Sequence, residues 1–443
     1  MKYTDTIKQL SFTKVNIFLI VFLPISLLIG SLIINLNIIL IIFLFFLDCK
    51  KRNNFLLFKE KSFFYLCIIW LYLIFNSLYV GDTSDSLVRS LGFIRFILLS
   101  FAIFFYLNIE NKFYKKTIFK YWVYIFLIVS IDLIFEFIFG KNVLGFQSNY
   151  GINPIEAERN VLNIFGYQLF YTGRLASFTG DELKIGGFYF GFIAITLAFI
   201  YKYYKKSYII FIIIFIIISL LIGERANFIR IILINFGFIF FVLNISYFKK
   251  IVFLFSLLII GLIIIANMPS LKSKFYNHIF NIPYGTKISE KNYQIEEILK
   301  NKYFSHYYTA INIFKENPIF GVGLKEFRLE STNKKYSPIE GAYGVGMHPH
   351  QVHFEILSEL GLIGYILIIS NLFYIVVNVL KNNNQRDIFT KSSIIFIICT
   401  FVPLIPSGGF FTTYGASIYW INYSLLIATL IKKENYEKIF LIK

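Results

Sequence analysis

Three of the five histidines of this chain fall within six residues, between Met347 and His353. His348 and His350 flank Pro349, directly before a long apolar run. Pro349 is well placed as a first helical residue, so His350 and His353 would share one helical face. Because neutral imidazole takes a proton from a hydroxyl, the segment is a candidate general-base site. The alternative is an interfacial polar cluster or a pH-sensitive cap. No Cys or carboxylate stands at matching ligand spacing, so we predict no metal site.

Charged side chains also lie inside apolar segments, where they are costly and are functional candidates by default. Arg89 and Arg95 lie in or beside the segment near 88–109, and Asp132 and Glu136 lie in the next one. The two carboxylates are four residues apart and so share a helical face. Counted from the outer ends of their segments, Arg95 and Asp132 come to similar depth, and we expect them to pair. The alternative is a salt bridge that only packs two helices.

Two further arginines stand at the edges of apolar segments. Arg225 lies in the tight turn 223–227, and Arg174 lies in the segment 173–182, which ends in a carboxylate pair. Arginine suits bidentate contact with phosphate, although an interfacial anchor that reaches to lipid head groups is the alternative for Arg225. Several arginines on one face indicate an anionic ligand, and a lipid-linked pyrophosphate would fit.

The elements that must position these residues are membrane-spanning helices. Apolar residues make up 57% of the 443 residues and charged residues only 15%, whereas soluble domains have about a quarter charged residues. Apolar runs near the length that spans a bilayer recur along the whole chain. We place the spans near 15–30, 32–48, 63–80, 88–109, 121–139, 186–201, 208–223, 228–246, 251–267, 354–380, 391–407 and 414–431. The expected fold is therefore an all-α polytopic membrane protein of about 12 transmembrane helices, with one large, partly helical periplasmic loop.

Basic clusters between the spans set the expected orientation. They alternate along the chain and account for much of the net charge of +18, so topology and anionic lipid explain it and we expect no nucleic-acid partner. Both termini then lie in the cytoplasm. Residues 1–267 hold the first nine spans and an outer loop of about 140–185, residues 268–353 form the large loop, and residues 354–443 hold the last three spans. The region 15–48 is either two helices hinged at Gly30 or one long helix with a re-entrant piece, and its flanking charges favour two crossings.

Two motifs carry a family resemblance. Residues 316–324 have the sequence ENPIFGVGL, and residues 350–364 have the sequence HQVHFEILSELGLIG. In this order and topology they resemble the O-antigen ligase and O-antigen polymerase superfamily of bacterial envelope enzymes. That family typically shows P-hydrophobic-hydrophobic-G-x-G in the large loop, then His-Asn and Gly-hydrophobic-hydrophobic-Gly at the next helix. Glu224-Arg225 stands where the family has a Ser-Arg or Glu-Arg turn, and the segment from Arg174 to Glu182 looks like a recurrent family segment.

The resemblance implies glycan transfer at the periplasmic face of the bacterial inner membrane. A glycan on undecaprenyl pyrophosphate passes to an acceptor hydroxyl, on lipid A–core for a ligase or on another lipid-linked repeat for a polymerase. We expect a ligase, with a polymerase as the alternative. No cofactor, nucleotide sugar or metal is needed, because the leaving group is already activated and arginines take its charge.

The resemblance, together with the residue types and positions described above, assigns roles to residues. His350 matches the essential histidine and is the predicted catalytic residue. The predicted pyrophosphate-binding residues are Arg225, Arg174, Arg95 and Arg89. The predicted supporting residues are Glu182, Glu224, His348, His353 and Arg328. Two departures stand out: Gln351 replaces the usual Asn, and the arginine that often precedes Pro318 is missing, so that its role is absent or passes to Lys302, His306 or Arg328.

Two other classes of protein remain as alternatives. A transporter or flippase of lipid-linked saccharides would use many spans and arginines, but it predicts internal repeats and broken helices near the midplane, and the sequence shows neither. A non-catalytic assembly or sensing protein would use histidine protonation. No phosphate-binding P-loop or dinucleotide fingerprint is present.

Overall fold

The structure is a computed structural model. It describes residues 2–146, 161–164, 167–170, 174–180, 182, 184–205, 207–267, 302–337, 344–381 and 387–440. Much of the predicted large loop, 268–301 and 338–343, and most of the first outer loop therefore lie outside the described residues.

The N-terminal part consists of long apolar helices. They are α1 (Lys2–Ile29), α2 (Ser31–Lys51), η1 (Leu56–Lys59), α3 (Lys61–Tyr79), α4 (Ser84–Gly92) and α5 (Ile94–Phe139). Gly30, at a φ of 138°, separates α1 from α2. The two helices run antiparallel, since the Asn16 amide donates to the Ile41 carbonyl (3.0 Å) and the Asn37 amide to the Leu19 carbonyl (3.1 Å). The prediction of two separate helices hinged at Gly30 is therefore confirmed, and their two membrane crossings stay a prediction.

The middle and C-terminal helices complete the bundle. They are α7 (Ile185–Tyr203), α8 (Tyr208–Ile222), α9 (Arg225–Phe241), α10 (Tyr247–Asn267), α16 (Val352–Lys381), α17 (Ile388–Thr400), α18 (Thr413–Tyr423), α19 (Ile427–Leu430) and α20 (Lys433–Phe440). Of the loops, η2 (Ser177–Thr179), α14 (Lys302–Glu316), α15 (Phe327–Glu330) and η4 (Lys334–Tyr336) are described. The prediction that the large loop is partly helical agrees with α14.

Every predicted span falls on a helix, although α5 holds parts of two of them. Lys112, at a φ of 67°, interrupts this 46-residue element between apolar stretches that end at Ile109 and begin at Lys112. Within the described residues seven helices are long and apolar enough to cross a membrane, and α8 and α17 are shorter apolar helices. The multi-pass character is confirmed, and the total of twelve stays a prediction. The all-α expectation needs one correction: β1 (Val161–Ile164) and β2 (Tyr167–Phe170) form an antiparallel hairpin.

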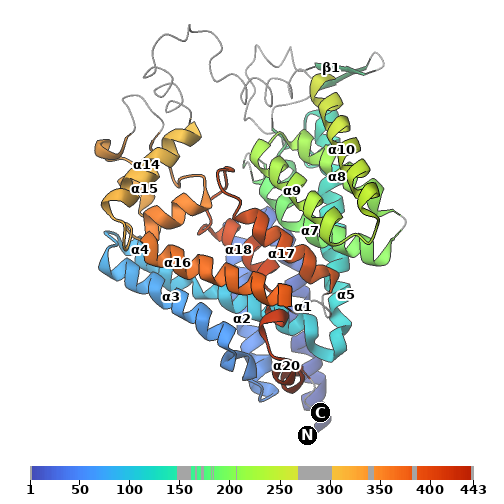
Figure 1. Ribbon diagram of the computed structural model, residues 1–443. Coiled ribbons are helices and arrows are strands. Elements are labelled where there is room, and N and C mark those ends of the chain that lie inside the picture. The colour runs from blue at the N-terminus through green and yellow to red at the C-terminus, as the bar shows by residue number, and fades with distance from the viewer. Residues whose placement is uncertain are drawn as a thin grey trace.

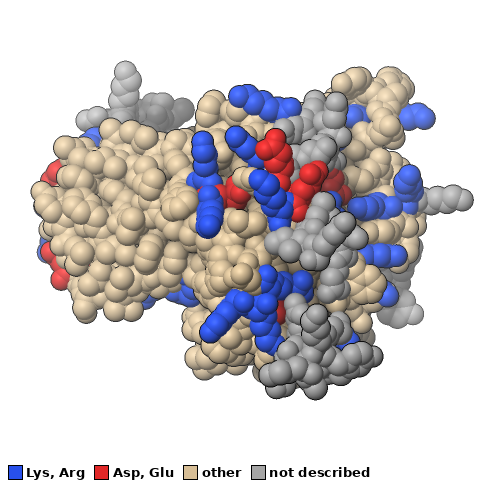
Figure 2. Space-filling model, turned by 90° about the horizontal axis from the view of Figure 1, so that it is seen from below, with Lys and Arg blue, Asp and Glu red and all other residues tan. Residues whose placement is uncertain are grey.

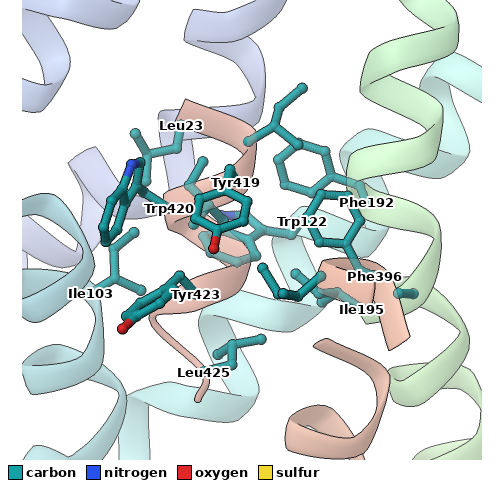
Figure 3. Packing of buried hydrophobic residues seen from close by; sticks show 14 of the residues in the cluster. Leu23, Ile103, Trp122, Phe192, Ile195, Phe396, Tyr419, Trp420, Tyr423 and Leu425 are labelled. Carbon is teal, nitrogen blue, oxygen red and sulfur yellow. The ribbon is translucent and has the colours of Figure 1, made fainter. Parts of the chain in front are cut away.

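The core surrounds the C-terminal helix α18. Figure 3 shows Tyr419, Trp420 and Tyr423 of α18 between residues of α1, α5, α7 and α17. All three side chains are at most 5% exposed. Large apolar side chains on the outer helices, such as Leu32 and Leu78, are instead about two-thirds exposed at 70% and 67%. Such surfaces are suited to lipid rather than water.

The two ends of the bundle differ. Both chain termini and α20 lie at one end, while α14, α15 and the β1–β2 hairpin lie at the other (Figure 1). We call these the terminal end and the loop end. Seen from the terminal end, Lys and Arg side chains gather on the surface (Figure 2). This distribution agrees with a cytoplasmic terminal end.

Candidate functional site

The two motifs pack against each other through their backbones. Helix α16 is broken at Gly361, which has φ 64° and ψ −167°. Four backbone hydrogen bonds join the break to the segment 318–323: Val322 N to Ser358 O (3.0 Å), Gly323 N to Glu359 O (2.8 Å), Leu362 N to Pro318 O (2.8 Å) and Ile363 N to Ile319 O (3.3 Å). The segment thus takes the place of the helical hydrogen bonds lost at the break, as backbone in a membrane requires.

The glycines of the motifs make this close approach possible. A Cβ at Gly361 would overlap the Ile319 carbonyl, and one at Gly321 would overlap the backbone of Glu359. Both glycines also have positive φ, where other residues are strained. The break in α16 was not predicted from the sequence, and it lies near the loop end of the helix rather than at its middle. The loop segment 318–323, which is distant in sequence, satisfies the freed backbone groups.

The histidine segment does not begin a helix at Pro349. Helix α16 begins at Val352, and the Gln351 side-chain oxygen accepts from His353 N (2.7 Å) and Phe354 N (3.1 Å). Gln351 thus caps the helix in the way a short polar residue usually does. His350 lies before the cap with a φ of 58°, uncommon for a residue other than glycine. The prediction that His350 and His353 share a helical face is therefore wrong.

His353 points into the helix bundle. Its Nε2 lies 2.7 Å from the Phe401 carbonyl oxygen, and its Nδ1 lies 3.0 Å from the Tyr365 hydroxyl. Because a carbonyl only accepts, Nε2 carries the hydrogen, and in the neutral ring Nδ1 accepts from Tyr365. His353 therefore fixes α16 against the α17–α18 loop, residues 401–412.

His350 lies instead in a cluster with residues of α14. Its ring centre is 4.2 Å from that of His348, 5.2 Å from that of His306 and 5.6 Å from that of Tyr303. We call Tyr303, His306, His348 and His350 the histidine cluster. His306 is buried, and its Nδ1 lies 3.2 Å from the Gly344 carbonyl oxygen, to which it donates. Ser407 N donates to the His350 carbonyl (2.6 Å), so the α17–α18 loop also holds His350.

The cluster gives His306 a place beside the predicted catalytic residue. His306 was one of three candidates for the role of the missing arginine. Another candidate, Arg328, lies elsewhere, and the third, Lys302, begins α14 with a side chain outside the description. Within the described residues, no three His, Cys, Asp or Glu side chains are arranged to share a metal ion.

Arg174 and Arg225 meet at the turn between α8 and α9. Gly223, at a φ of 80°, ends α8, and Leu175 N donates to the Ile222 carbonyl (3.2 Å), which brings Arg174 to the turn. Arg174 and Tyr303 both lie in the surroundings of Arg225, although the positive charges of the two arginines repel each other. Since Tyr303 contacts His350, the two arginines and the histidine cluster belong to one site at the loop end.

Glu224 builds this turn. Its carboxylate accepts from the Asn227 side chain (2.6 Å). It also lies against Gly186, in the first turn of α7. Burial raises the pKa of the Glu224 carboxyl, although Asn227 and Arg174 oppose the rise. A carboxylate at a helix N-terminus is electrostatically favourable. Glu224 thus joins α7 to the α8–α9 turn, while Glu182 is exposed and pairs with its neighbour Lys184.

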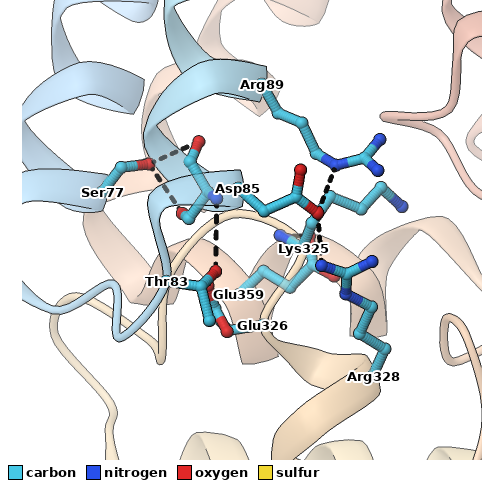
Figure 4. A network of polar contacts seen from close by, with 9 residues as sticks. Ser77, Thr83, Asp85, Arg89, Lys325, Glu326, Arg328 and Glu359 are labelled. Atoms are coloured by element: carbon cyan, nitrogen blue, oxygen red, sulfur yellow. Dashed lines mark hydrogen bonds and ion pairs between the residues drawn. The ribbon is translucent and has the colours of Figure 1, made fainter.

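Arg89, Arg95 and Arg328 form a second group, around α4 and α15. Asp85 binds both Arg89 (3.3 Å) and Arg328 (Figure 4). Arg95 donates to the Gly92 carbonyl (2.6 Å) and lies over the Phe96 ring. The structure therefore divides the four predicted pyrophosphate-binding arginines into two pairs, and no contact between the pairs is found among the described residues.

The predicted pairing of Arg95 with Asp132 is wrong. Asp132 accepts from Val143 N (2.9 Å) and from the Ser177 hydroxyl, and Glu136 accepts from Ala176 N (3.1 Å) and Ser177 N (2.6 Å). The two carboxylates do share a face, as predicted. Glu136 binds the backbone of the segment that carries Arg174, and Asp132 binds the Ser177 hydroxyl of the same segment, so both help to position the first arginine pair.

Two buried charged groups were missed from the sequence. Lys325 contacts Glu355 (3.0 Å), and its backbone N–H donates to Glu359 (2.9 Å). Burial lowers the pKa of Lys325, but the attraction of these two carboxylates outweighs it and the net shift is upward. Glu355 and Glu359, four apart in an apolar helix, carried the same signal that singled out Asp132 and Glu136. Arg230 of α9 is also buried and donates to the Ile405 carbonyl (3.1 Å).

The comparison with known proteins agrees with this geometry. A family model described as O-antigen ligase matches residues 222–369. The resemblance to the O-antigen ligase superfamily is confirmed. No curated protein matches the chain. The O-antigen ligase match begins at the end of α8 and ends within α16, so it contains Arg225, the histidine cluster and both motifs. It supports an enzyme of the O-antigen ligase or polymerase type, in a multi-pass membrane protein.

Proposed function

We propose that this protein transfers a glycan from undecaprenyl pyrophosphate to an acceptor hydroxyl at the periplasmic face of the inner membrane, without a metal ion. The acceptor is lipid A–core. The observation that carries the proposal is the single site formed by His350 and the arginines of two other segments. A general base and a pair of guanidinium groups are the parts that glycosyl transfer from a pyrophosphate requires.

Arg174 and Arg225 bind the pyrophosphate in this proposal. Guanidinium groups make paired hydrogen bonds to phosphate oxygens and stabilise the charge that grows as the bond to the sugar breaks. The carboxylates of Asp132, Glu136 and Glu224 hold the two arginine-bearing segments in place. The donor is thereby oriented before the acceptor arrives.

His350 takes the proton of the acceptor hydroxyl. The acceptor oxygen forms a bond to the anomeric carbon, and the bond from that carbon to the pyrophosphate oxygen breaks. The electron pair leaves with undecaprenyl pyrophosphate, and the proton stays on the imidazole until it passes to water. The packing of His348, His306 and Tyr303 around the ring keeps its orientation fixed.

A reconstituted transfer assay tests the proposal. Purified protein receives undecaprenyl-pyrophosphate glycan with or without lipid A–core, and EDTA is present throughout. Product on lipid A–core alone supports the ligase, whereas longer lipid-linked chains without lipid A–core would establish the polymerase instead. Absence of both products in protein that binds the donor would contradict glycan transfer.

The broken helix α16 bears on the transporter alternative. Broken helices in transporters expose half-helix ends to a substrate. Here the backbone of residues 318–323 fills the break, and the Tyr72 hydroxyl donates to the Leu360 carbonyl (2.6 Å). The break is therefore closed by protein, which favours a fixed loop scaffold over a transport site.

A further inference from the structure

A cavity lies beside the second arginine group. Its volume is about 260 Å³, and it lies between α2, the α4–α5 junction and the start of α18. The polar residues that line it are Asn35, Asp85, Arg89, Arg95 and Thr413. It is large enough to hold several waters or a polar head group.

The charges around the cavity favour an anion. Asp85 is shared between Arg89 and Arg328, so one carboxylate faces two guanidinium groups. The Gly92 carbonyl takes one N–H of Arg95, and no carboxylate in the described part of the chain pairs with this arginine. Lys325, near Arg89, is already paired with buried carboxylates. Of the charged residues that line the cavity, Arg89 and Arg95 outnumber Asp85, so the lining has a net positive charge, to which Thr413 adds the N-terminal end of α18.

The α17–α18 loop separates this cavity from the histidine cluster. Ser407 N bonds the His350 carbonyl on one side, and Phe411 lines the cavity on the other. Phe410 N donates to Glu355 (2.7 Å) between them. A pyrophosphate that leaves the carbon attacked near His350 must lie directly beside that carbon. Arg174 and Arg225 meet this condition, because Tyr303 places them next to His350. We therefore expect the cavity to bind a different anionic group.

We propose that the arginine-lined cavity is a second anion site, which binds a phosphate group of the acceptor lipid. This inference rests on the proposed glycan transfer and adds the chemistry of the acceptor. Arg89 and Arg95 hold the lipid phosphate, and the acceptor hydroxyl then reaches across the α17–α18 loop to His350. Lipid A–core and a second lipid-linked chain both carry such a phosphate.

Binding to the full-length His350→Ala protein in nanodiscs tests the inference without any transfer. The probes are lipid A–core, the same lipid after removal of its phosphates, and undecaprenyl pyrophosphate. Arg89→Gln and Arg95→Gln are expected to weaken binding of phosphorylated lipid A–core about tenfold or more, because each removes a charge-assisted contact. Arg95→Lys is expected to retain part of the affinity. Lys120→Gln is the control. It removes an exposed charge from α5 and is expected to leave the binding of every probe unchanged.

The arms of the experiment distinguish the two phosphate sources. If the acceptor is a second lipid-linked chain, undecaprenyl pyrophosphate binds twice per protein, and Arg95→Gln reduces this to one. The inference is overturned if folded Arg89→Gln and Arg95→Gln proteins bind every probe like the parent. It is also overturned if they lose the donor site that Arg225→Gln leaves intact. Neither outcome depends on whether the wild-type protein transfers a glycan.

Discussion

Two histidines three residues apart have different surroundings. Both ring nitrogens of His353 are engaged within the bundle, by Phe401 and Tyr365. His350 lies outside the helix, among aromatic and imidazole rings at the loop end. We therefore assign a positioning role to His353 and the chemistry to His350.

The proposed role of Arg225 gives a prediction for donor binding. Arg225→Gln is expected to raise the KM for undecaprenyl-pyrophosphate glycan about tenfold or more, because it removes charge-assisted hydrogen bonds to phosphate. Arg225→Lys retains the charge but not the paired geometry, so its donor KM is expected to lie between those of the parent and Arg225→Gln. Initial rates at varied donor concentration measure the effect, with Lys120→Gln as the control. An unchanged donor KM in Arg225→Gln would contradict this role.

For single residues, the sequence identifies the candidate functional side chains better than it identifies the groups that they contact. His350, Arg174 and Arg225 are predicted from residue type and family motif, and the structure brings them together. The Arg95–Asp132 pair fails, because Asp132 accepts instead from the backbone N–H of Val143 and from the Ser177 hydroxyl. A pattern of charges does not reveal backbone partners.

Among the elements, the break in α16 depends on Gly361. Gly361→Ala adds a Cβ against the Ile319 carbonyl at a positive φ. We expect a loss of about 2–4 kcal/mol of stability from strain and overlap, measured as lower apparent thermal stability in detergent. Gly261→Ala is the matched control, since nothing lies within 4 Å of its Cβ position. Equal stability of the two variants would show that the break does not require glycine.

Asp387 joins three helices near the terminal end. It precedes α17 and pairs with Lys115 of α5 and Lys202 of α7. Burial alone raises the pKa of the Asp387 carboxyl, but the attraction of both lysines outweighs it and holds the pKa below its usual 3.8. A carboxyl with a lowered pKa stabilises the fold above its unfolded pKa, and this contribution is lost as pH falls through the folded value.

Asp387→Asn is therefore expected to be less stable than the parent at pH 7, by about 1–3 kcal/mol for a partly buried pair. The difference in stability between the variant and the parent should become smaller as the pH falls below 3.8. Thermal unfolding across this pH range measures it, and Asp82→Asn, at an exposed site, is the control. A variant as stable as the parent at pH 7 would rule out a stabilising ion pair.

For the whole molecule, the distribution of charge predicts the orientation. Both termini share the end where Lys and Arg gather (Figures 1 and 2). In a cysteine-free background, we expect Met347→Cys, at an exposed loop-end site, to react with an impermeant maleimide in spheroplasts. Lys120→Cys is expected to react only after lysis. Reaction of Lys120→Cys in intact spheroplasts would contradict the predicted orientation in the membrane.

The sequence predicts the membrane spans of this fold, but it predicts fewer of the contacts that hold the spans and loops together. Apolar runs mark each span because lipid requires them. The break at Gly361, the cap at Gln351 and the pair of Lys325 with Glu355 depend on residues that are far apart in sequence or satisfied by backbone. Such contacts follow from tertiary packing, which no local pattern encodes.

The central claim is that His350 accepts the acceptor proton. The most direct test is single-turnover transfer by purified full-length His350→Ala, with donor binding measured in the same preparation. We predict a fall in the transfer rate of about 10²–10⁴-fold, as for the loss of a general base, with donor binding retained. Transfer at the parent rate would contradict the account.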